Sequence, residues 1–503
     1  MTAYEDLMKR FKEIVLIGTA AGILQWDLQS YMPPRAASFR GEQLASIGVL
    51  IHRLQTSAEA GELLSRAEAE SHDADEVRAR NLHLLRKSYD QETRLPEDLV
   101  ADLAKQQAIA TDVWNRTKPK SDWKTFEPEL KKLFDLAVRR CELLEEIKGV
   151  KTPYDAAVDD FEPMMSSDQI ATVFGELRPE LVQMTKKYGQ ASKAVDPKVV
   201  IRKLGKDSQK VLVEDAVNLI GYDTRSENAG GRLDEVMHAF TIGYYDDVRV
   251  TMHYRDDDPL GSVLTGMHEG GHALYEQNLN RDWMYQPLGA SASSGIHESI
   301  SRFYENMIGR SPEFWSFYLP RVNQLSSGLF SDVRSPDLLR ALNRVVPSKI
   351  RITADEVTYS LHVIIRFEIE KALFDGKVEV SELPSLWNEK YDSYLGVKIE
   401  NDGEGVMQDM HWSNGYFGYF PSYALGNVYG GMWLDVLTSK LPTWKKSVAK
   451  GDMRVVRNWL TEQIFAKSNL YYPDGLVSKV TGKKITAKPF LSYLRTKYDA
   501  LFK

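Results

Sequence analysis

His-Glu-Gly-Gly-His-Ala-Leu-Tyr-Glu-Gln, residues 268–277, is bracketed by apolar residues at helical spacing. Residues four apart on a helix lie on one face, so His268 and His272 can offer two imidazole nitrogens to one ion. Glu269 then points beside that ion, where it can take a proton from water and later release it. The stretch therefore predicts a helix that carries a divalent metal, with Glu269 as general base.

The two glycines in this stretch need a reason, because each costs a helix about 1 kcal/mol relative to alanine. Close packing of Gly270 and Gly271 against a substrate or a second ligand helix would supply one. The alternative is chance, since the chain has 10 histidines in 503 residues. A spacing of this kind arises accidentally in about one or two such chains per hundred.

A catalytic zinc site also needs a third protein ligand and an open fourth position. Glu298, which lies 26 residues after His272 and opens a second helical stretch, can supply that ligand. Its neighbour His297 is the other candidate, and spacing favours Glu298. Arg302, one turn further on, would orient the Glu298 carboxylate or form an ordinary surface ion pair with it.

The composition fits a globular protein, with 43% hydrophobic and 27% charged residues and a net charge of −7. No block rich in Lys and Arg is present, which argues against nucleic acid as a partner. The acidic start of the chain predicts no export signal. Residues 14–26 form the longest uncharged apolar stretch, which is too short to span a membrane and predicts a buried helix. A single cysteine, Cys141, lies on a helical apolar stripe and favours a cytoplasmic location and a structural role.

Helical periodicity dominates residues 1–190, and alternation over residues 239–254 predicts a β-hairpin. Small residues at 289–295, and Gly and Tyr at 401–431, predict loops. We expect one domain (1–503) of two interleaved lobes. The first, 1–190, is helical and lid-like, and the second, 191–503, contains the hairpin, the metal site and the substrate groove.

Several motifs in order along the chain resemble the carboxypeptidase Taq family of zinc metallocarboxypeptidases, which is similar in fold to angiotensin-converting enzyme and neurolysin. A single His-Glu-x-x-His motif is moderately specific, whereas the ordered set is highly specific. The motifs are Trp26-Asp27 with Met32-Pro33-Pro34, Asp247-Val248-Arg249-Val250-Thr251, residues 268–277, His297-Glu298-Ser299, and residues 350–355 and 405–412.

The resemblance implies a mostly α, two-lobed metallopeptidase with a deep central groove and a small β-sheet next to the metal helix. It implies zinc (Zn²⁺), with cobalt (Co²⁺) as the alternative, held by His268, His272 and Glu298. It also implies a homodimer that removes single residues from peptides with a free C-terminus. His238 is carried over as a catalytic residue, although Ala239 follows it where bacterial relatives usually have proline.

A carboxypeptidase must recognise a free carboxylate, and the planar donors of arginine pair with a carboxylate at two points. Arg351 is the candidate, although an arbitrary arginine is more often part of a surface ion pair. Residues 353–356 follow it as a capping-box pattern, which predicts a helix from there to Gly376.

The oxyanion formed during peptide hydrolysis needs neutral or cationic donors beside the metal. His411, Tyr419 and Tyr423 are suitable by type, with Tyr423 favoured, although packing is the commoner role for any one tyrosine. The predicted strand offers an edge on which an extended peptide could pair. The competing hypotheses are an oligopeptidase of the same fold that cuts internally and a helical binding protein whose metal motif is unused.

Overall fold

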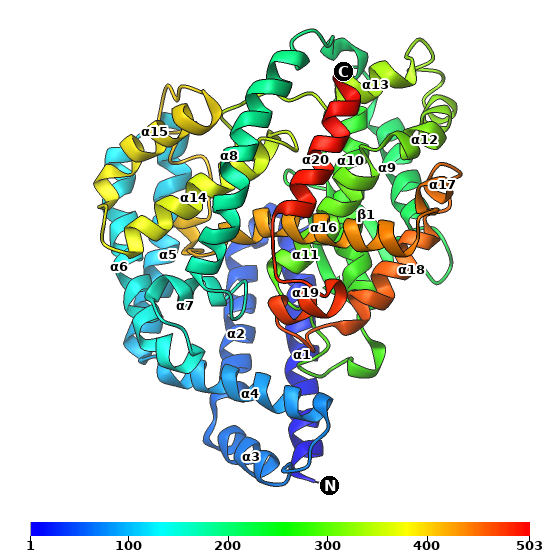
Figure 1. Ribbon diagram of the computed structural model, residues 1–503. Helices are drawn as coiled ribbons and strands as arrows, with labels where there is room; N and C mark the ends of the chain where they lie inside the picture. The colour runs from blue at the N-terminus through cyan, green and yellow to red at the C-terminus, as the bar shows by residue number, and fades with distance from the viewer. Residues whose placement is uncertain (1) are drawn as a thin grey trace.

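The computed structural model describes residues 2–503 and confirms the predicted fold class, a mostly helical chain with one small sheet (Figure 1). The helices of the first part are α1 (Ala3–Gln29), α2 (Ala37–Thr56), α3 (Ala58–Ala69), α4 (Glu76–Arg94), α5 (Glu97–Thr117), α6 (Trp123–Lys148), α7 (Pro153–Asp159) and α8 (Ser167–Ser192).

Local sequence signals set the ends of these helices. The Asp122 side chain accepts a hydrogen bond from the backbone N–H of Thr125 and caps the start of α6. Gly149 ends α6 with a left-handed φ of 67°, a conformation that glycine adopts without steric cost. Ser166 and Gln169 form a capping box at the start of α8.

The middle of the chain builds the sheet and the helices next to it. Its elements are α9 (Lys206–Ile220), β1 (Gly231–Glu235), β2 (Phe240–Tyr244), β3 (Asp247–Met252), α10 (Pro259–Gln277), α11 (Ser294–Arg302) and the π-helical turn η5 (Phe303–Ile308). The strand order is β1-β3-β2, with β2 antiparallel and β1 parallel to β3. The predicted hairpin is confirmed as β2 and β3. We did not foresee β1, because its five residues show no clear alternation.

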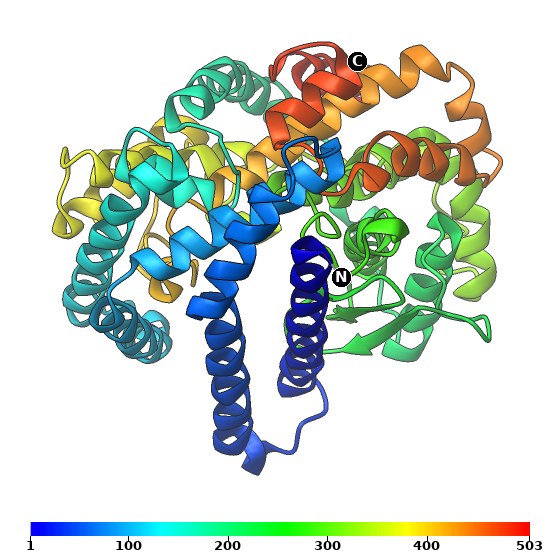
Figure 2. The same ribbon diagram turned by 90° about the horizontal axis from the view of Figure 1, so that it is seen from below.

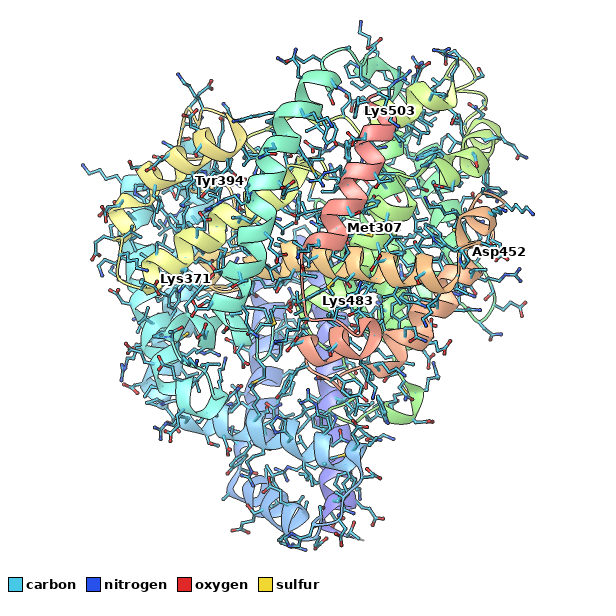
Figure 3. The ribbon with its side chains drawn as sticks, viewed as in Figure 1. Met307, Lys371, Tyr394, Asp452, Lys483 and Lys503 are labelled. Atoms are coloured by element: carbon cyan, nitrogen blue, oxygen red, sulfur yellow. The ribbon has the colours of Figure 1, made fainter. Side chains whose placement is uncertain are left out.

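The last part of the chain contains α12 (Pro312–Leu325), α13 (Ser335–Leu342), α14 (Tyr359–Phe374), α15 (Leu383–Leu395), α16 (Phe420–Lys440), α17 (Trp444–Val448), α18 (Arg454–Gln463), α19 (Pro473–Thr481) and α20 (Lys488–Leu501). In Figure 3, Lys371 on α14 and Tyr394 on α15 lie on the opposite side of the body from Asp452, and α16 crosses between these sides.

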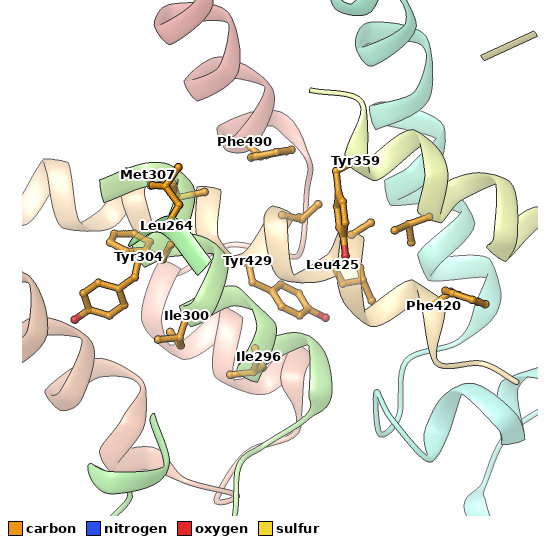
Figure 4. Close-up of a cluster of buried hydrophobic side chains, with 14 of the residues drawn as sticks. Leu264, Ile296, Ile300, Tyr304, Met307, Tyr359, Phe420, Leu425, Tyr429 and Phe490 are labelled. Carbon is orange, nitrogen blue, oxygen red and sulfur yellow. The ribbon is translucent and has the colours of Figure 1, made fainter. Parts of the chain in front are cut away.

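The predicted loop at 401–431 is wrong from Phe420 onward, where α16 begins. Its glycines allow helices to approach one another: a Cβ on Gly431 would lie 2.6 Å from the Phe490 Cα of α20. Figure 4 shows that α16 also packs on α11, with Tyr429 beside Ile296. Glycine in this segment therefore marks close helix contacts rather than a flexible loop.

The helix predicted to begin at residues 353–356 instead begins at Tyr359. Residues Arg351–Thr353 form a single 3₁₀ turn. The Asp355 side chain accepts hydrogen bonds from the backbone N–H groups of Val346, Val357 and Thr358. Asp355 thus connects the residues before α14 with Val346, on the other side of the 3₁₀ turn, and the expected capping box is not formed.

The helices α1 to α4, residues 3–94, form an N-terminal arm in which α1 and α2 run side by side away from the body (Figure 2). Its tip, where the start of α1 meets α3 and α4 at the bottom of Figure 1, has a small core of its own, made of Ala3, Leu7, Leu64, Ala67 and Leu82. A much larger core runs through the body from Ala110 to Tyr498. The arm is therefore stabilised partly by contacts separate from the main core.

Residues 14–26 are helical, as predicted, but the prediction that this helix is buried is wrong. Leu16 and Ile23 are 48% and 44% exposed, and Trp26 alone of these residues is buried. The Trp26 ring lies under the guanidinium groups of Arg249 and Arg232, at 4.4 and 4.8 Å. These contacts attach the end of α1 to the sheet, so two of the motifs quoted above touch each other.

Cys141 is 2% exposed, and burial raises the pKa of its thiol to about 11, which disfavours the thiolate that a nucleophile needs. Among the described residues, no helix is long and apolar enough to cross a membrane. The division into lobes at residue 190 stays a prediction.

Candidate metal centre

The helices α10 and α11 bring the three predicted ligands together. Atoms of His268, His272 and Glu298 that can bind a metal all lie within 4.8 Å of one another. Glu298 Oε2 is 3.7 Å from His268 Nε2 and 3.3 Å from His272 Nε2. Two imidazole nitrogens and one carboxylate oxygen thus converge on one point, the arrangement expected from their spacing.

Glycine lets the helices come this close. A Cβ on Gly271 would lie 2.8 Å from the Cα of Ser301 on α11, and one on Gly426 of α16 would lie 2.7 Å from Glu298 Cγ. Gly270 instead faces α9, where a Cβ would meet Ile220 at 3.0 Å. The expected packing against a second ligand helix is therefore found at Gly271, and α16 supports the same helix from its other side.

The outer nitrogen of each imidazole has its own partner. His268 Nδ1 lies 2.9 Å from Glu305 Oε2, and His272 Nδ1 lies 2.5 Å from His297 Nδ1. His297 Nε2 in turn lies 2.9 Å from Glu276 Oε1. Such contacts fix the ring orientation and direct Nε2 toward the centre. His297, the alternative ligand, thus lies behind His272 and outside the cluster.

Arg302 connects the carboxylates of this region. It donates from Nε to Glu298 Oε1 at 2.9 Å and from Nη1 to Glu305 Oε2 at 3.1 Å, and its side chain is only 12% exposed. The alternative of an exposed surface pair is therefore wrong. Glu305 was not predicted, because the π-helical turn that presents it has no distinctive sequence pattern.

The charge states suit metal binding. Burial opposes ionisation of Glu298, but the charges of His268 and Arg302 outweigh it and lower the pKa of this carboxyl below its usual value. Burial lowers the pKa of His272 to about 3, so its ring is neutral at pH 7. Metals bind neutral imidazole and ionised carboxylate, and His272 and Glu298 are in these forms. Burial opposes charging of His268, but Glu298 and Glu305 outweigh it and raise the pKa of this ring, so a bound metal takes the place of its proton.

Glu269 is 7% exposed, and burial raises the pKa of its carboxyl. The Thr241 hydroxyl on β2 lies 2.7 Å from Glu269 Oε2, a contact that our sequence analysis missed. The one clue in the sequence was that Thr241 lies three residues after His238, in the same stretch. The His238 side chain is exposed in the link between β1 and β2, and no hydrogen bond within residues 2–503 holds it.

Arg351 is 5% exposed and lies in a second group of buried charges. Its Nε and Nη2 donate to Asp409 Oδ1 at 3.1 and 2.9 Å, and Arg366 Nη2 lies 2.6 Å from Asp409 Oδ2. The Arg351 guanidinium is 4.7 Å from the centre of the Tyr423 ring. The Tyr423 hydroxyl lies 3.1 Å from His411 Nε2, and Tyr419 packs on Tyr423 at 5.2 Å between ring centres.

Tyr359 joins the two groups. Its ring lies 3.8 Å from the Arg302 guanidinium, and its hydroxyl accepts a hydrogen bond from Arg351 Nη1 at 3.2 Å. The predicted metal ligands and the predicted carboxylate-binding and oxyanion residues therefore belong to one region of the molecule.

Glu370 holds the segment that carries His411 and Tyr419. Its carboxylate accepts hydrogen bonds from Trp412 Nε1 at 2.7 Å, from the Gly418 N–H at 3.0 Å and from the Tyr154 hydroxyl at 2.9 Å. Burial raises its pKa to about 7. This segment is therefore positioned by a buried group rather than by regular secondary structure.

Comparison with known proteins decides the family. The model of a family described as carboxypeptidase Taq (M32) metallopeptidase matches residues 6–498. The chain belongs to this family. It is a metallocarboxypeptidase, that is, a peptide hydrolase that uses a divalent metal ion. Membership sets aside the hypothesis of a binding protein with an unused metal motif.

Named relatives of this carboxypeptidase cover nearly the whole chain. It is 34% identical to thermostable carboxypeptidase 1 of Thermus thermophilus over 99% of both chains. It is also 34% identical to carboxypeptidase 1 of Bacillus subtilis, over 99% of this chain and 97% of the relative. Its fold matches the M32 carboxypeptidase of Deinococcus radiodurans with a TM-score of 0.95 and 31% identity, over 99% of both chains.

Proposed function

We propose that this carboxypeptidase removes single residues from the C-terminus of peptides, with zinc held by His268, His272 and Glu298. The observation that carries the proposal is the junction at Tyr359, which contacts Arg302 beside the ligands and Arg351 on the other side. A hydrolytic centre and a cationic group for a carboxylate are thereby held at a fixed separation.

The donor set fits zinc, which binds imidazole nitrogen and carboxylate oxygen in fourfold coordination and leaves one position open at catalytic sites. Cobalt takes similar ligands and stays the alternative. The ion, when bound, supplies Lewis-acid activation of water and of the scissile carbonyl. Glu305 and His297 hold the two imidazole rings so that each presents Nε2 to it.

Glu269 serves as general base and then as general acid. It follows His268 directly on α10, and its raised pKa brings it closer to the working pH, where proton transfer in both directions is efficient. It removes a proton from the attacking water and later gives that proton to the leaving amine.

Arg351 binds the C-terminal carboxylate of the peptide. Two guanidinium groups, those of Arg351 and Arg366, share the single carboxylate of Asp409, which leaves one positive charge uncompensated among these three groups. A peptide carboxylate would complete the neutralisation. The charge pair with Asp409 also keeps the guanidinium plane fixed, which favours recognition at two points.

The remaining predicted residues surround the scissile bond. Tyr423 donates a hydrogen bond to the developing oxyanion, with His411 and Tyr419 supporting its ring and hydroxyl. Strand β2 is an edge of the sheet, so an extended peptide can pair with it, and the nearby exposed His238 is free to contact that peptide.

A pair of peptides that differ only at the C-terminus tests the proposal. We expect the free acid to lose its last residue and the C-terminal amide to be cleaved at least about 100 times more slowly, since a desolvated ionic pair is lost. Rapid internal cleavage of the amide would instead favour the helical oligopeptidase. The Glu269→Gln variant is the control, and it should cleave neither peptide.

Two further properties are proposed on the resemblance and the composition. We expect a homodimer, which sedimentation velocity of the purified protein measures directly. We expect a cytoplasmic location, in line with the single cysteine of the sequence. Fractionation of the source cells checks it.

A further inference from the structure

The Thr241 side chain contacts Glu269, and the proposed mechanism assigns no role to Thr241. Its hydroxyl lies 2.7 Å from Glu269 Oε2 and 3.1 Å from the main-chain oxygen of Glu269. Along β2, Thr241 thus faces α10, whereas its neighbour Ile242 faces α1, where a Cβ on Gly22 would lie 3.8 Å from Ile242 Cδ1. The alternation of the strand therefore aims one hydroxyl at the proposed base.

The single hydroxyl proton can serve only one of the two oxygens. The main-chain oxygen of Glu269 lies inside α10, where Ala273 N–H is its helical partner. The carboxylate oxygen is closer, and it carries negative charge, which makes hydrogen bonds shorter and stronger. The proton of Thr241 is therefore donated to the Glu269 carboxylate.

The bond from Thr241 is the one side-chain hydrogen bond to the Glu269 carboxylate in the described part of the chain, although Glu269 is 7% exposed. A glutamate has three side-chain torsions, and a base that rotates away from the reacting water loses much of its effect. One hydroxyl therefore restricts the position of this carboxylate.

The strand that presents Thr241 is itself held firmly. The Thr251 hydroxyl on β3 accepts a hydrogen bond from the Phe240 N–H at 2.9 Å and lies 3.0 Å from the Phe240 carbonyl oxygen. Thr241 also pairs with Val250 in the register of the β-ladder. The residue next to Thr241 is thus fixed by a side chain as well as by the sheet, so the hydroxyl is preorganised.

We propose that Thr241 is a positioning residue that holds the Glu269 carboxylate in its reactive orientation through this hydrogen bond. The inference rests on the proposed role of Glu269 as general base. Thr241 acts through Glu269, and within residues 2–503 its side chain makes no hydrogen bond to the three metal ligands, so its loss affects turnover rather than metal binding or substrate affinity.

The experiment compares Thr241→Val, which keeps the shape and removes the hydroxyl, with Thr241→Ser, which keeps the hydroxyl. Thr185→Val is the matched control, because Thr185 is 4% exposed on α8 and its hydroxyl has no partner among the described residues. Each zinc-loaded variant is assayed for kcat, KM and bound zinc. Thr241→Ala replaces Thr241→Val if the valine variant does not fold.

We expect Thr241→Val to lower kcat about 10- to 100-fold, as loss of a supporting hydrogen bond does at metal sites. KM and zinc content should stay within about twofold, and Thr241→Ser should recover most of kcat. The inference is overturned if Thr241→Val matches wild type while Glu269→Gln is inactive, or if serine fails to restore kcat. If Glu269→Gln is itself active, the proposed base is wrong.

Discussion

The two sides of the active region are built in different ways. The metal side lies on packed helices, and glycine at positions 271 and 426 brings α10, α11 and α16 into close contact. The Arg351 side lies on a 3₁₀ turn and an irregular segment, and buried ions and hydrogen bonds to Asp409 and Glu370 hold it in place. The metal side is thus stabilised by close helix packing, and the Arg351 side by ion pairs and hydrogen bonds.

This difference decides what a sequence can reveal. His268 and His272 are one helical turn apart, so elementary helix geometry predicts their meeting. Arg351 and Asp409 are separated by 58 residues, and no local rule connects them. The chemistry of the metal side was therefore predictable from spacing, whereas the residues of the Arg351 side came from family motifs.

The largest expected effect is on the metal side. Glu298→Gln keeps the volume of the side chain but removes a charged ligand and replaces the ionic contact with Arg302 at 2.9 Å by a neutral one. We expect zinc affinity to collapse and kcat/KM to fall by about a thousandfold or more, since metal activation contributes several kcal/mol. Metal analysis after dialysis, together with peptide assays, measures both. Normal zinc content would show that Glu298 is not a ligand.

The next effect separates the two sides. Arg351→Ala should lower kcat/KM for a free-acid peptide by about 2–4 kcal/mol, or about 30- to 1000-fold, while zinc content stays normal. The kcat/KM of Arg351→Lys should lie between those of wild type and Arg351→Ala, because lysine keeps the charge but loses two-point pairing. Zinc loss in either variant would mean that the sides cannot be perturbed separately.

Close helix packing is tested by two matched substitutions on α16. A Cβ at Gly426 would lie 2.7 Å from Glu298 Cγ, whereas one at Gly430 would lie 3.1 Å from the flexible end of Met307. Gly426→Ala should destabilise the fold by about 1–3 kcal/mol and weaken zinc binding. Gly430→Ala should destabilise the fold less and weaken zinc binding less. Thermal unfolding with and without zinc measures this; equal effects would contradict the proposed contact.

The last effect, which appears only as a dependence on pH, concerns a buried carboxyl group that supports the metal side. Glu162 accepts hydrogen bonds from the Gly295 N–H of α11 and from the Tyr429 hydroxyl, and burial raises its pKa from 4.5 to about 7. The folded state holds this proton more tightly, so its contribution to stability is full below pH 4.5 and is lost as the pH rises through about 7.

Glu162→Gln removes this titration. The stability of the variant relative to wild type should therefore improve between pH 5 and pH 8, by at most about 3 kcal/mol. Chemical unfolding at several pH values measures the difference. A difference that is independent of pH would show that Glu162 titrates normally.

The fold class, the hairpin and the meeting of His268 with His272 were predictable because each depends on periodicity or on residues close in sequence, whereas the choice of Glu298 over His297 also needed the family motif. The start of α16 was not, since glycines at 426, 430 and 431 are typical of loops unless the neighbouring helices are known. Thr241 and Glu305 were missed for a related reason. Each contacts the site through a partner 28 or 37 residues away, which no spacing rule identifies.

The small separate core of the N-terminal arm has a consequence for local unfolding. Five buried side chains stabilise the arm tip, while the main core is many times larger. Segments with few buried contacts open at lower free energy than the rest of the molecule. Backbone amides of α3 and the start of α1 should thus exchange with deuterium well before those of α10 and α16. A protease should cut this tip first and leave the hydrolytic region intact.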